Sequence, residues 1–361
     1  MNFNAFEPGV LIYTIYIFLL LAVTIFRYNK SNKDNLLLFV FFVVLQVLMG
    51  GLRSYTVGMD TASYVYSINK YITYDIDEII SNRHGRDPYF YVFTKIITSI
   101  NESYTFLFFV LNLLWWCLVA YIYYKYSESC LIALLLLVVF RQNYFAWSGF
   151  RQGLAMAFVA FSFKYLESRK LLKYVLVIVL ASLCHKSALL FVPVYFIDKV
   201  RLNKTLLVLG LLVVSVIMAF VIPNIEVEED MVYSGYLSHN NFGNMFSFII
   251  IAISFIYIMI IIPRGKLDER QNLLFTLSLF TIMMSMMGVR LAVAYRIAAY
   301  FNMFMPILMS NLMINRKSHK GAILGVSIVI IIIYIVTGMP PGLDDYKFYW
   351  EITFLDYENN M

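Results

Sequence analysis

The sequence predicts an all-α, polytopic helical membrane protein, and three observations lead to that class. Of its 361 residues 61% are hydrophobic and 14% are charged, whereas soluble domains carry about 25% charged residues. Apolar runs of about 17–20 residues, the length that crosses a bilayer, recur along the chain. The longest polar stretch, residues 53–103, is too short for a sizeable soluble domain. We therefore expect a single integral membrane domain over residues 1–361.

About twelve membrane segments are expected. In chain order they are 10–26, 36–52, 104–124, 130–147, 150–167, 171–184, 187–197, 205–223, 244–263, 271–288, 294–313 and 321–338. The sixth and seventh are short and meet at His185-Lys186. Basic residues flank both outer ends of this pair, so the positive-inside rule predicts that it enters the membrane and returns, like a re-entrant hairpin.

Charge counts then assign the sides of the membrane. The loops assigned to the cytoplasm hold 17 of the 28 Lys and Arg and 6 of the 22 Asp and Glu, a net charge of +11, while the outer segments carry −5. This asymmetry predicts that both termini lie outside the cytoplasm. It also places outside an acidic loop, 224–243, and a C-terminal tail, 339–361, which we expect to fold back over the outer face.

The outer segment 53–103 is expected to contain short interfacial helices. Asp87 followed by Pro88 is typical of a helix N-cap with proline at the first helical position. Apolar residues then repeat at helical spacing, at Phe90, Phe93, Ile97 and Ile100. This pattern predicts a helix that lies on the membrane or dips into it.

Two arginines occur at membrane depth, where charge is costly. Arg141 lies inside an apolar run, and Arg151 begins the next run after a break at Trp147-Ser148-Gly149. An arginine inside a bilayer costs about 2.5–3.5 kcal/mol, so each needs a compensating interaction. One interpretation is structural: the side chain reaches the membrane surface or pairs with a carboxylate. The other is an anion site, because a guanidinium binds two phosphate oxygens at once and keeps its charge.

Three further arginines lie near the same predicted outer face. Arg53 follows the end of one apolar run, Arg290 ends another, and Arg296 lies at the outer start of the next. With the two above they outnumber the acids at that depth, of which Asp60 is the obvious one. This excess indicates a polyanionic ligand, and a diphosphate fits. Each arginine could instead be a solvated charge at a helix end.

Two titratable residues are candidate catalytic bases. His185 and Lys186 split the short apolar pair. A lone histidine is often a hydrogen-bonded structural residue, but neutral imidazole can accept a proton, and Lys186 could add a phosphate contact. Asp60 could take a proton from a substrate hydroxyl, or it could cap a helix that starts at Thr61. Imidazole is the better proton acceptor of the two, which favours His185.

No metal, cofactor or nucleic-acid site is expected. Cys117, Cys130 and Cys184 fall in or beside apolar runs and form no CxxC pair. Asp75-Ile76-Asp77 matches a metal-binding DxD pattern, which we interpret as a solvated acidic loop. The net charge of +6 is spread over short loops between apolar runs, so it does not indicate nucleic-acid binding.

Four motifs, taken in order, resemble those of the EpsG family, the Wzy-like polymerases of bacterial exopolysaccharide, capsule and O-antigen. They span nearly the whole chain, and Met59 replaces a more usual small or polar residue. The motifs are Arg53…Val57-Gly58-Met59-Asp60-Thr61…Tyr64, Phe150-Arg151-Gln152-Gly153-Leu154-Ala155, His185-Lys186-Ser187-Ala188-Leu189…Pro193, and Tyr295-Arg296 before Tyr300-Phe301.

The resemblance implies a GT-C-like membrane glycosyltransferase that polymerises oligosaccharide repeat units. Its substrate would be an oligosaccharide linked to undecaprenyl diphosphate at the outer leaflet of the bacterial cytoplasmic membrane. The arginines would stabilise the diphosphate as it leaves, without a metal or other cofactor. A flippase and a chain-length regulator are implied as possible partners.

Other functions remain open at this point. A glycan ligase, or another polyprenyl-linked glycosyltransferase, would use the same outer arginines. A glycolipid flippase would need carboxylates or glycine-broken helices near the midplane, and mid-membrane carboxylates are not found. A membrane acyltransferase would need a histidine paired with Asp or Asn at fixed spacing inside the bundle, and that pattern is not found either.

Overall fold

The computed structural model describes residues 8–81, 87–199, 210, 213, 242–262, 267–289, 291–314 and 346–351. These residues are almost all helical, and the extended pairing among them is one antiparallel bridge between Arg53 and Phe348. The chain divides into two compact units, and each is described by itself. Unit 1 comprises Met1–Val192 with Ser327–Met361, and unit 2 comprises Pro193–Val326.

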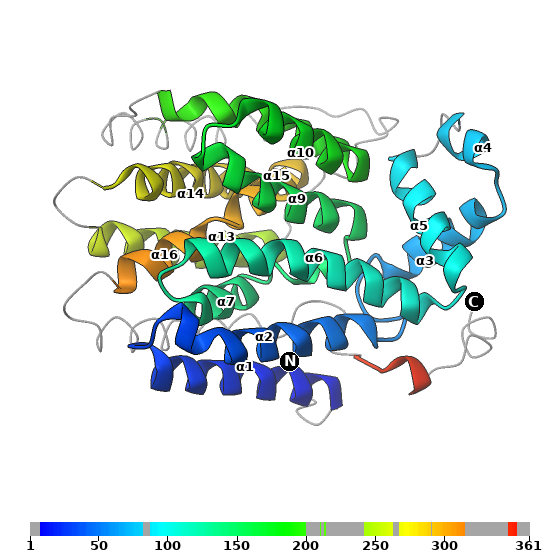
Figure 1. Cartoon of the computed structure of the whole chain (residues 1–361), viewed down its shortest axis with the longest axis horizontal. Helices are drawn as coiled ribbons and strands as arrows, with labels where there is room; N and C mark the ends of the chain where they lie inside the picture. The colour runs from blue at the N-terminus through cyan, green and yellow to red at the C-terminus, as the bar shows by residue number, and fades with distance from the viewer. Residues whose placement is uncertain are drawn as a thin grey trace. The chain divides into compact units, whose positions relative to one another are not determined.

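Unit 1 holds most of the described helices (Figure 1). They are α1 Pro8–Arg27, α2 Asn32–Gly51, α3 Thr61–Ile72, α4 Ile76–Ser81, α5 Pro88–Ile100, α6 Tyr104–Tyr126, α7 Cys130–Val139, α8 Tyr144–Trp147, α9 Phe150–Glu167, α10 Leu171–Cys184 and the short 3₁₀ turn η3 Tyr349–Glu351. A 3₁₀ segment, η1 Lys186–Lys199, follows α10 and crosses the unit boundary. Unit 2 holds α13 Phe242–Ile261, α14 Glu269–Gly288, α15 Ala292–Asn302 and α16 Met305–Ile314.

Four helical stretches are long and apolar enough to cross a membrane: Asn32–Gly51, Tyr104–Tyr126, Glu269–Gly288 and Val293–Ile314. Five shorter apolar helices accompany them within the described residues. The helical class is therefore confirmed, while the count of twelve and the GT-C-like architecture stay predictions. Segment 321–338 and residues 224–241 of the predicted acidic loop lie outside the described residues, as does nearly all of 205–223, while residues 242–243 begin α13.

Two predicted segments are broken by turns. Arg141 has a left-handed backbone, with φ of 58°, and separates α7 from α8. The next residues bury amide groups that need hydrogen-bond partners: Asn143 Nδ2 donates to Gln46 Oε1 at 3.0 Å, and Gln142 Nε2 donates to the Phe140 carbonyl at 3.0 Å. In unit 2 a turn divides α15 from α16, where Pro306 lacks an N–H for a continuous helix.

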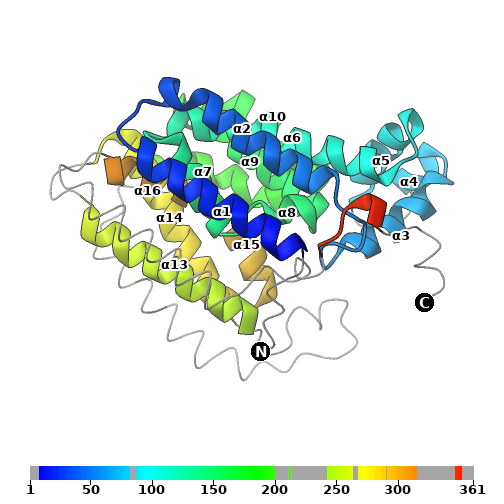
Figure 2. The ribbon, with the colours of Figure 1, turned by 90° about the horizontal axis from the view of Figure 1, so that it is seen from below.

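The antiparallel pair of α9 and α10 positions the candidate site. A three-residue connection joins these two helices, and they pack along their lengths. The start of α9 and the end of α10 therefore lie at the same end of the pair. Figures 1 and 2 both show α3, α4 and α5 gathered at one end of unit 1, beside the ends of α2 and α6.

The apolar face of α5 packs largely against protein, and its location at the membrane surface stays a prediction. Phe90 is 1% exposed and Ile97 is 5% exposed, within a core cluster that includes Tyr64, Phe108 and Phe150. Ile100, at the end of the same predicted stripe, remains 73% exposed. The α3–α5 segment is thus a packed cap on the helices of unit 1.

Candidate functional site

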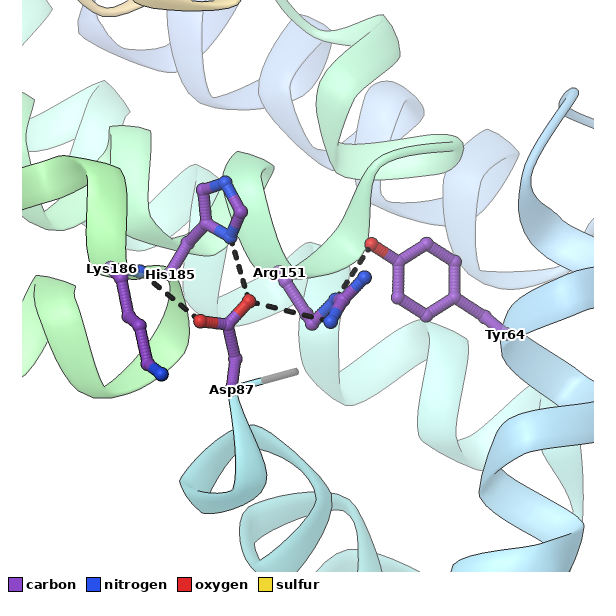
Figure 3. A network of polar contacts seen from close by, with 5 residues as sticks. All are labelled: Tyr64, Asp87, Arg151, His185 and Lys186. Atoms are coloured by element: carbon purple, nitrogen blue, oxygen red, sulfur yellow. Dashed lines mark hydrogen bonds and ion pairs between the residues drawn. The ribbon is translucent and has the colours of Figure 1, made fainter. Parts of the chain in front are cut away.

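The Asp87 carboxylate joins three segments that lie far apart in the sequence (Figure 3). Its Oδ2 lies 2.8 Å from His185 Nδ1 and 3.3 Å from Arg151 Nη1. Its Oδ1 accepts a hydrogen bond of 3.2 Å from the backbone N–H of Lys186. Arg151 in turn donates through Nε to the Tyr64 hydroxyl at 3.3 Å. We call Tyr64, Asp87, Arg151, His185 and Lys186 the Asp87 cluster.

Helix ends supply most of this cluster. Arg151 lies in the first turn of α9, His185 is the C-cap residue of α10, and Asp87 immediately precedes α5. Tyr64 comes from the first turn of α3. Side chains at helix ends can point beyond the helix, so four packed helices can direct polar groups to one place without burying charge along their lengths.

The prediction that Asp87 is the N-cap residue of α5 and Pro88 its first helical residue is confirmed. Asp87 holds the N-cap place, but it has a φ of 55°, and its side chain makes no capping hydrogen bond. The left-handed backbone is uncommon for a residue other than glycine, and such strain is often found at functional sites. Here it accompanies a carboxylate that bonds to α9 and to the α10–η1 junction instead of to α5.

Electrostatics keep Asp87 ionised. Burial alone would raise the pKa of its carboxyl, but the His185 hydrogen bond, the His185 and Arg151 charges and the Lys186 N–H outweigh burial and lower that pKa. The Asp87 side chain is only 4% exposed, compared with 19% for Arg151 and 24% for His185. The carboxylate is therefore the buried member of the cluster, and the Arg151 and His185 side chains are its accessible edge.

This geometry sets the orientation of the imidazole. An ionised carboxylate only accepts hydrogen bonds, so the ring nitrogen that faces it, Nδ1, carries the proton. The other ring nitrogen, Nε2, points away from Asp87 (Figure 3). In neutral imidazole Nε2 is the proton acceptor. The pair can accept a proton from a ligand on the side of His185 that faces away from Asp87.

Aromatic rings enclose the Arg151 guanidinium. Its Cζ lies 5.4 Å from the centroid of the Tyr64 ring and 5.8 Å from that of Tyr91. Burial raises the pKa of the Tyr64 hydroxyl, and this effect exceeds the opposing effect of the Arg151 charge. Tyr64 is therefore a neutral partner of the arginine, and Asp87 supplies the negative charge.

Arg53 has a different environment. Its side chain is fully buried, and its guanidinium donates to the carbonyls of Gly50 and Trp147. The Cζ atom lies 4.4 Å from the ring centroid of Phe108 and 5.3 Å from that of Phe150. These contacts fasten the end of α2 to α6, α8 and α9. They indicate a structural role, and the diphosphate role of Arg53 stays a prediction.

The motif around Asp60 is a packed turn with an exposed acid. Gly58 has a φ of 101°, and Thr61 Oγ1 donates to the Val57 carbonyl at 2.7 Å. The backbone N–H of Asp60 donates to Ser148 Oγ at 3.0 Å. Asp60 holds the N-cap place of α3, but its exposed side chain makes no capping hydrogen bond. The turn therefore presents the Asp60 carboxylate to solvent.

The remaining predicted residues are only partly brought together. The Lys186 side chain is exposed, although its backbone N–H joins the cluster. Arg141 is half-buried in the turn after α7. Arg296 is half-buried in α15 of unit 2, and Arg290 lies outside the described residues. Arg151, His185 and Lys186 thus meet in one cluster, with Asp87 as the acid that sequence reasoning assigned elsewhere.

The described part of the chain offers groups for proton transfer and not for binding a metal ion. There, no group of three His, Cys, Asp or Glu side chains could hold a metal ion. The cluster offers one carboxylate, one imidazole and one guanidinium with phenol hydroxyls nearby. That set suits acid–base chemistry beside an anionic group.

The comparison with protein families matches the EpsG family over residues 35–348. The chain belongs to the EpsG family. This is a family of Wzy-like polysaccharide polymerases, and the match includes every member of the Asp87 cluster as well as Arg53 and Arg296. The resemblance seen in the sequence motifs is therefore confirmed. Neither the search of curated proteins nor that of solved structures gave a significant match.

Proposed function

We propose that this EpsG-family chain is a membrane glycosyltransferase that joins lipid-linked oligosaccharide repeat units into a polysaccharide. The observation that carries the proposal is the Asp87–His185 pair, with Arg151 on the same carboxylate, at an accessible end of the helices. A growing chain on undecaprenyl diphosphate is the donor. A new lipid-linked repeat unit is the acceptor, as the family suggests.

The proposed reaction exchanges one bond to the anomeric carbon for another. The hydroxyl oxygen at the non-reducing end of the acceptor attacks the anomeric carbon of the donor. The bond from that carbon to the diphosphate oxygen breaks, and undecaprenyl diphosphate leaves with the electron pair. The hydroxyl proton goes to Nε2 of His185, while Asp87 holds Nδ1–H and stabilises the imidazolium that forms.

The arginines are proposed to act on the diphosphate. Negative charge develops on the leaving group, and a fixed guanidinium stabilises it without a metal. Arg151 is placed for this role because it lies beside His185 through their shared carboxylate and keeps 19% exposure. Lys186, Arg141, Arg290 and Arg296 are proposed as further diphosphate contacts, and Asp60 as a contact to the acceptor hydroxyl.

We propose a location to match this chemistry. The protein would span the bacterial cytoplasmic membrane many times, with the Asp87 cluster facing the outside. Its substrate would arrive through a flippase, and a chain-length regulator could limit the polymer.

Polymer analysis of a deletion strain tests the proposed function. Loss of the gene should leave surface glycan of a single repeat unit and accumulate lipid-linked repeat. Complementation with the wild-type chain should restore long polymer. A glycan ligase would give the opposite pattern, in which long lipid-linked polymer forms but is not transferred. A flippase would leave the lipid-linked repeat on the cytoplasmic side, where an impermeant oxidant cannot reach it.

A further inference from the structure

Unit 1 contains a cavity of about 390 Å³ that shares no residue with the Asp87 cluster. Ligand pockets in proteins have volumes of about 300–1,000 Å³, so this one can hold part of a small ligand. Its walls come from α3, the start of α6, the end of the α2 segment and the C-terminal segment. The residues that matter here are Arg53, Asn69, Glu102, Tyr104, Phe108 and Tyr349.

The charge of this cavity does not suit a phosphate. Its guanidinium, Arg53, is fully buried and already donates to two backbone carbonyls. The exposed charge among the lining residues is the Glu102 carboxylate, and Asn69 adds an exposed amide. A carboxylate accepts hydrogen bonds and repels anions, and an amide both donates and accepts. The ligand that fits is uncharged and carries hydroxyl groups.

Aromatic side chains provide the other half of the cavity wall. Tyr104 reaches Asn69 Oδ1 with its hydroxyl and thereby joins α6 to α3. Tyr349 is 48% exposed and comes from the C-terminal segment. That segment is held by backbone hydrogen bonds, from Ser54 N–H to the Lys347 carbonyl at 2.7 Å and from Tyr349 N–H to the Leu52 carbonyl at 3.0 Å. The backbone that carries Tyr349 is thus held in place, and the Tyr349 ring is accessible.

The cavity also lies close to the Asp87 cluster through shared packing. Two of its lining residues contact Phe150: the Arg53 Cζ atom lies 5.3 Å from the Phe150 ring centroid, and the Phe108 and Phe150 centroids are 5.3 Å apart. Phe150 directly precedes Arg151 in α9. The buried Phe150 side chain therefore lies between the cavity and the cluster.

We propose that this cavity binds the glycan part of a lipid-linked repeat unit. A sugar ring has an apolar C–H face that packs on an aromatic ring and a rim of hydroxyls that bonds to carboxylate and amide groups, which matches Tyr349, Glu102 and Asn69. The proposal rests on the proposed function, because it assigns one substrate group to each of two neighbouring sites. The Asp87 cluster binds the diphosphate and accepts the proton, and the cavity binds the sugar.

Glycan binding to the purified full-length protein tests this assignment. The probe is the oligosaccharide that mild acid releases from the lipid-linked repeat of the deletion strain, because it carries neither lipid nor phosphate. Tyr349→Ala should weaken its binding about tenfold, since an aromatic contact and its buried area are lost. Tyr349→Phe should keep the affinity within about twofold, because the ring remains. Glu102→Gln should weaken binding by a smaller factor.

A neighbouring aromatic provides the matched control. Trp350 is 58% exposed and stacks on Phe348 at a centroid distance of 4.4 Å, but it does not line the cavity. Trp350→Ala removes an edge contact to the Tyr349 ring at 4.9 Å but no lining residue, so it should weaken glycan binding much less than Tyr349→Ala. If Tyr349→Ala and Trp350→Ala behave alike, or if Tyr349→Ala binds glycan as the wild type does, the glycan site is contradicted, and equal losses would point to membrane anchoring.

The two proposals fail in different ways. If the deletion strain still makes long polymer, the polymerase function is wrong whatever the cavity binds. If the deletion strain loses polymer but the released oligosaccharide shows no binding to the wild-type protein, the polymerase stands and the glycan cavity is wrong.

Discussion

Arg53 and Arg151 look alike in the sequence, since each lies at a boundary of an apolar run, but their surroundings in the structure differ. Arg53 is fully buried among aromatic rings and donates to backbone carbonyls. Arg151 pairs with a carboxylate that also holds a histidine, and it keeps 19% exposure. The guanidinium of Arg53 therefore joins helices. The guanidinium of Arg151 lies at an accessible edge, beside a histidine that can accept a proton.

The comparison shows what separates structural from chemical arginines in a helical membrane protein. Burying a guanidinium costs free energy at both positions, so that cost alone does not identify a functional site. The hydrogen-bond partner of the guanidinium identifies the site. Backbone carbonyls accept from a guanidinium without involving a second titratable group. A shared carboxylate instead couples the guanidinium to a second titratable side chain.

Removing the charge at Asp87 should abolish most activity. Asp87→Asn keeps the shape but no longer orients the imidazole or stabilises its charged form, so we expect a fall in the polymerisation rate of about 100-fold or more. Because Asp87 acts through His185, the loss should appear in kcat with little change in KM. The measurement is chain elongation by purified protein on lipid-linked repeat. Asp77→Asn, an exposed acid on α4, is the control and should be silent.

The same experiment can contradict the account. If the Asp87→Asn protein has the wild-type kcat, the Asp87 contacts are structural and do not position the base. A loss confined to KM would move Asp87 from positioning the base to binding substrate.

Substitution of Arg53 should lower the stability of the protein, whereas substitution of Arg151 should lower its activity. Arg53→Met removes two charge-assisted hydrogen bonds from a buried site, so we expect a loss of about 3 kcal/mol of unfolding free energy. Arg151→Lys keeps the charge but loses the planar fork, so it should unfold like the wild type and still elongate poorly. Thermal unfolding in detergent and chain elongation measure the two effects. A fully stable Arg53→Met protein that makes no polymer would restore Arg53 as a diphosphate contact.

Substitution of Gly58 should lower the stability of the protein because of the backbone conformation at this residue. Its φ of 101° is strained for any residue with a Cβ, and that Cβ would lie 2.6 Å from Thr61 Oγ1. Gly58→Ala should cost about 1–2 kcal/mol and disturb the turn that presents Asp60. Gly149→Ala is the matched control, since Gly149 has a φ of −97° and its added Cβ would make only an ordinary contact at 3.4 Å. Equal melting temperatures for the two variants would refute the strain argument.

Acid should remove the Asp87 contribution to stability, and this is the smallest effect. The folded-state pKa of Asp87 is lowered, below the value of about 3.9 for an unfolded chain. The ionised carboxylate therefore stabilises the fold above that unfolded pKa, and the stabilisation is lost as pH falls through the folded pKa. The difference in unfolding free energy between wild type and Asp87→Asn should shrink as pH falls below about 4, where the Asp87 carboxylate becomes protonated. A difference that grows below about pH 4 would contradict this sign.

Local sequence signals predicted the helices well. The expected segments 150–167 and 171–184 coincide with α9 and α10, because Gly149 ends one apolar run and His185 ends another. Turns inside apolar runs were less visible. The break at Arg141 depends on buried amides, including Asn143, whose partners Tyr13 and Gln46 lie about a hundred residues away or more.

The site was only half predictable for the same reason. His185, Lys186 and Arg151 could be found as charges at the ends of apolar runs. Asp87 could not, since Asp-Pro is a strong helix-start signal and the His185 contact spans 98 residues. One signal was available: two cations expected on one face need a carboxylate, and segment 53–103 contains acids besides Asp60. How Arg296 lies relative to this cluster depends on the arrangement of two units, which no local pattern specifies.

The most direct test of the central claim is the polymer length distribution of His185→Ala, measured beside Asp60→Asn at matched membrane abundance. If His185 is the base held by Asp87, His185→Ala should yield only single repeat units while the purified protein still binds lipid-linked repeat. Asp60→Asn should retain shortened polymer. Wild-type chain lengths from His185→Ala, together with an inactive Asp60→Asn, would contradict the account and assign proton transfer to the exposed acid at the start of α3.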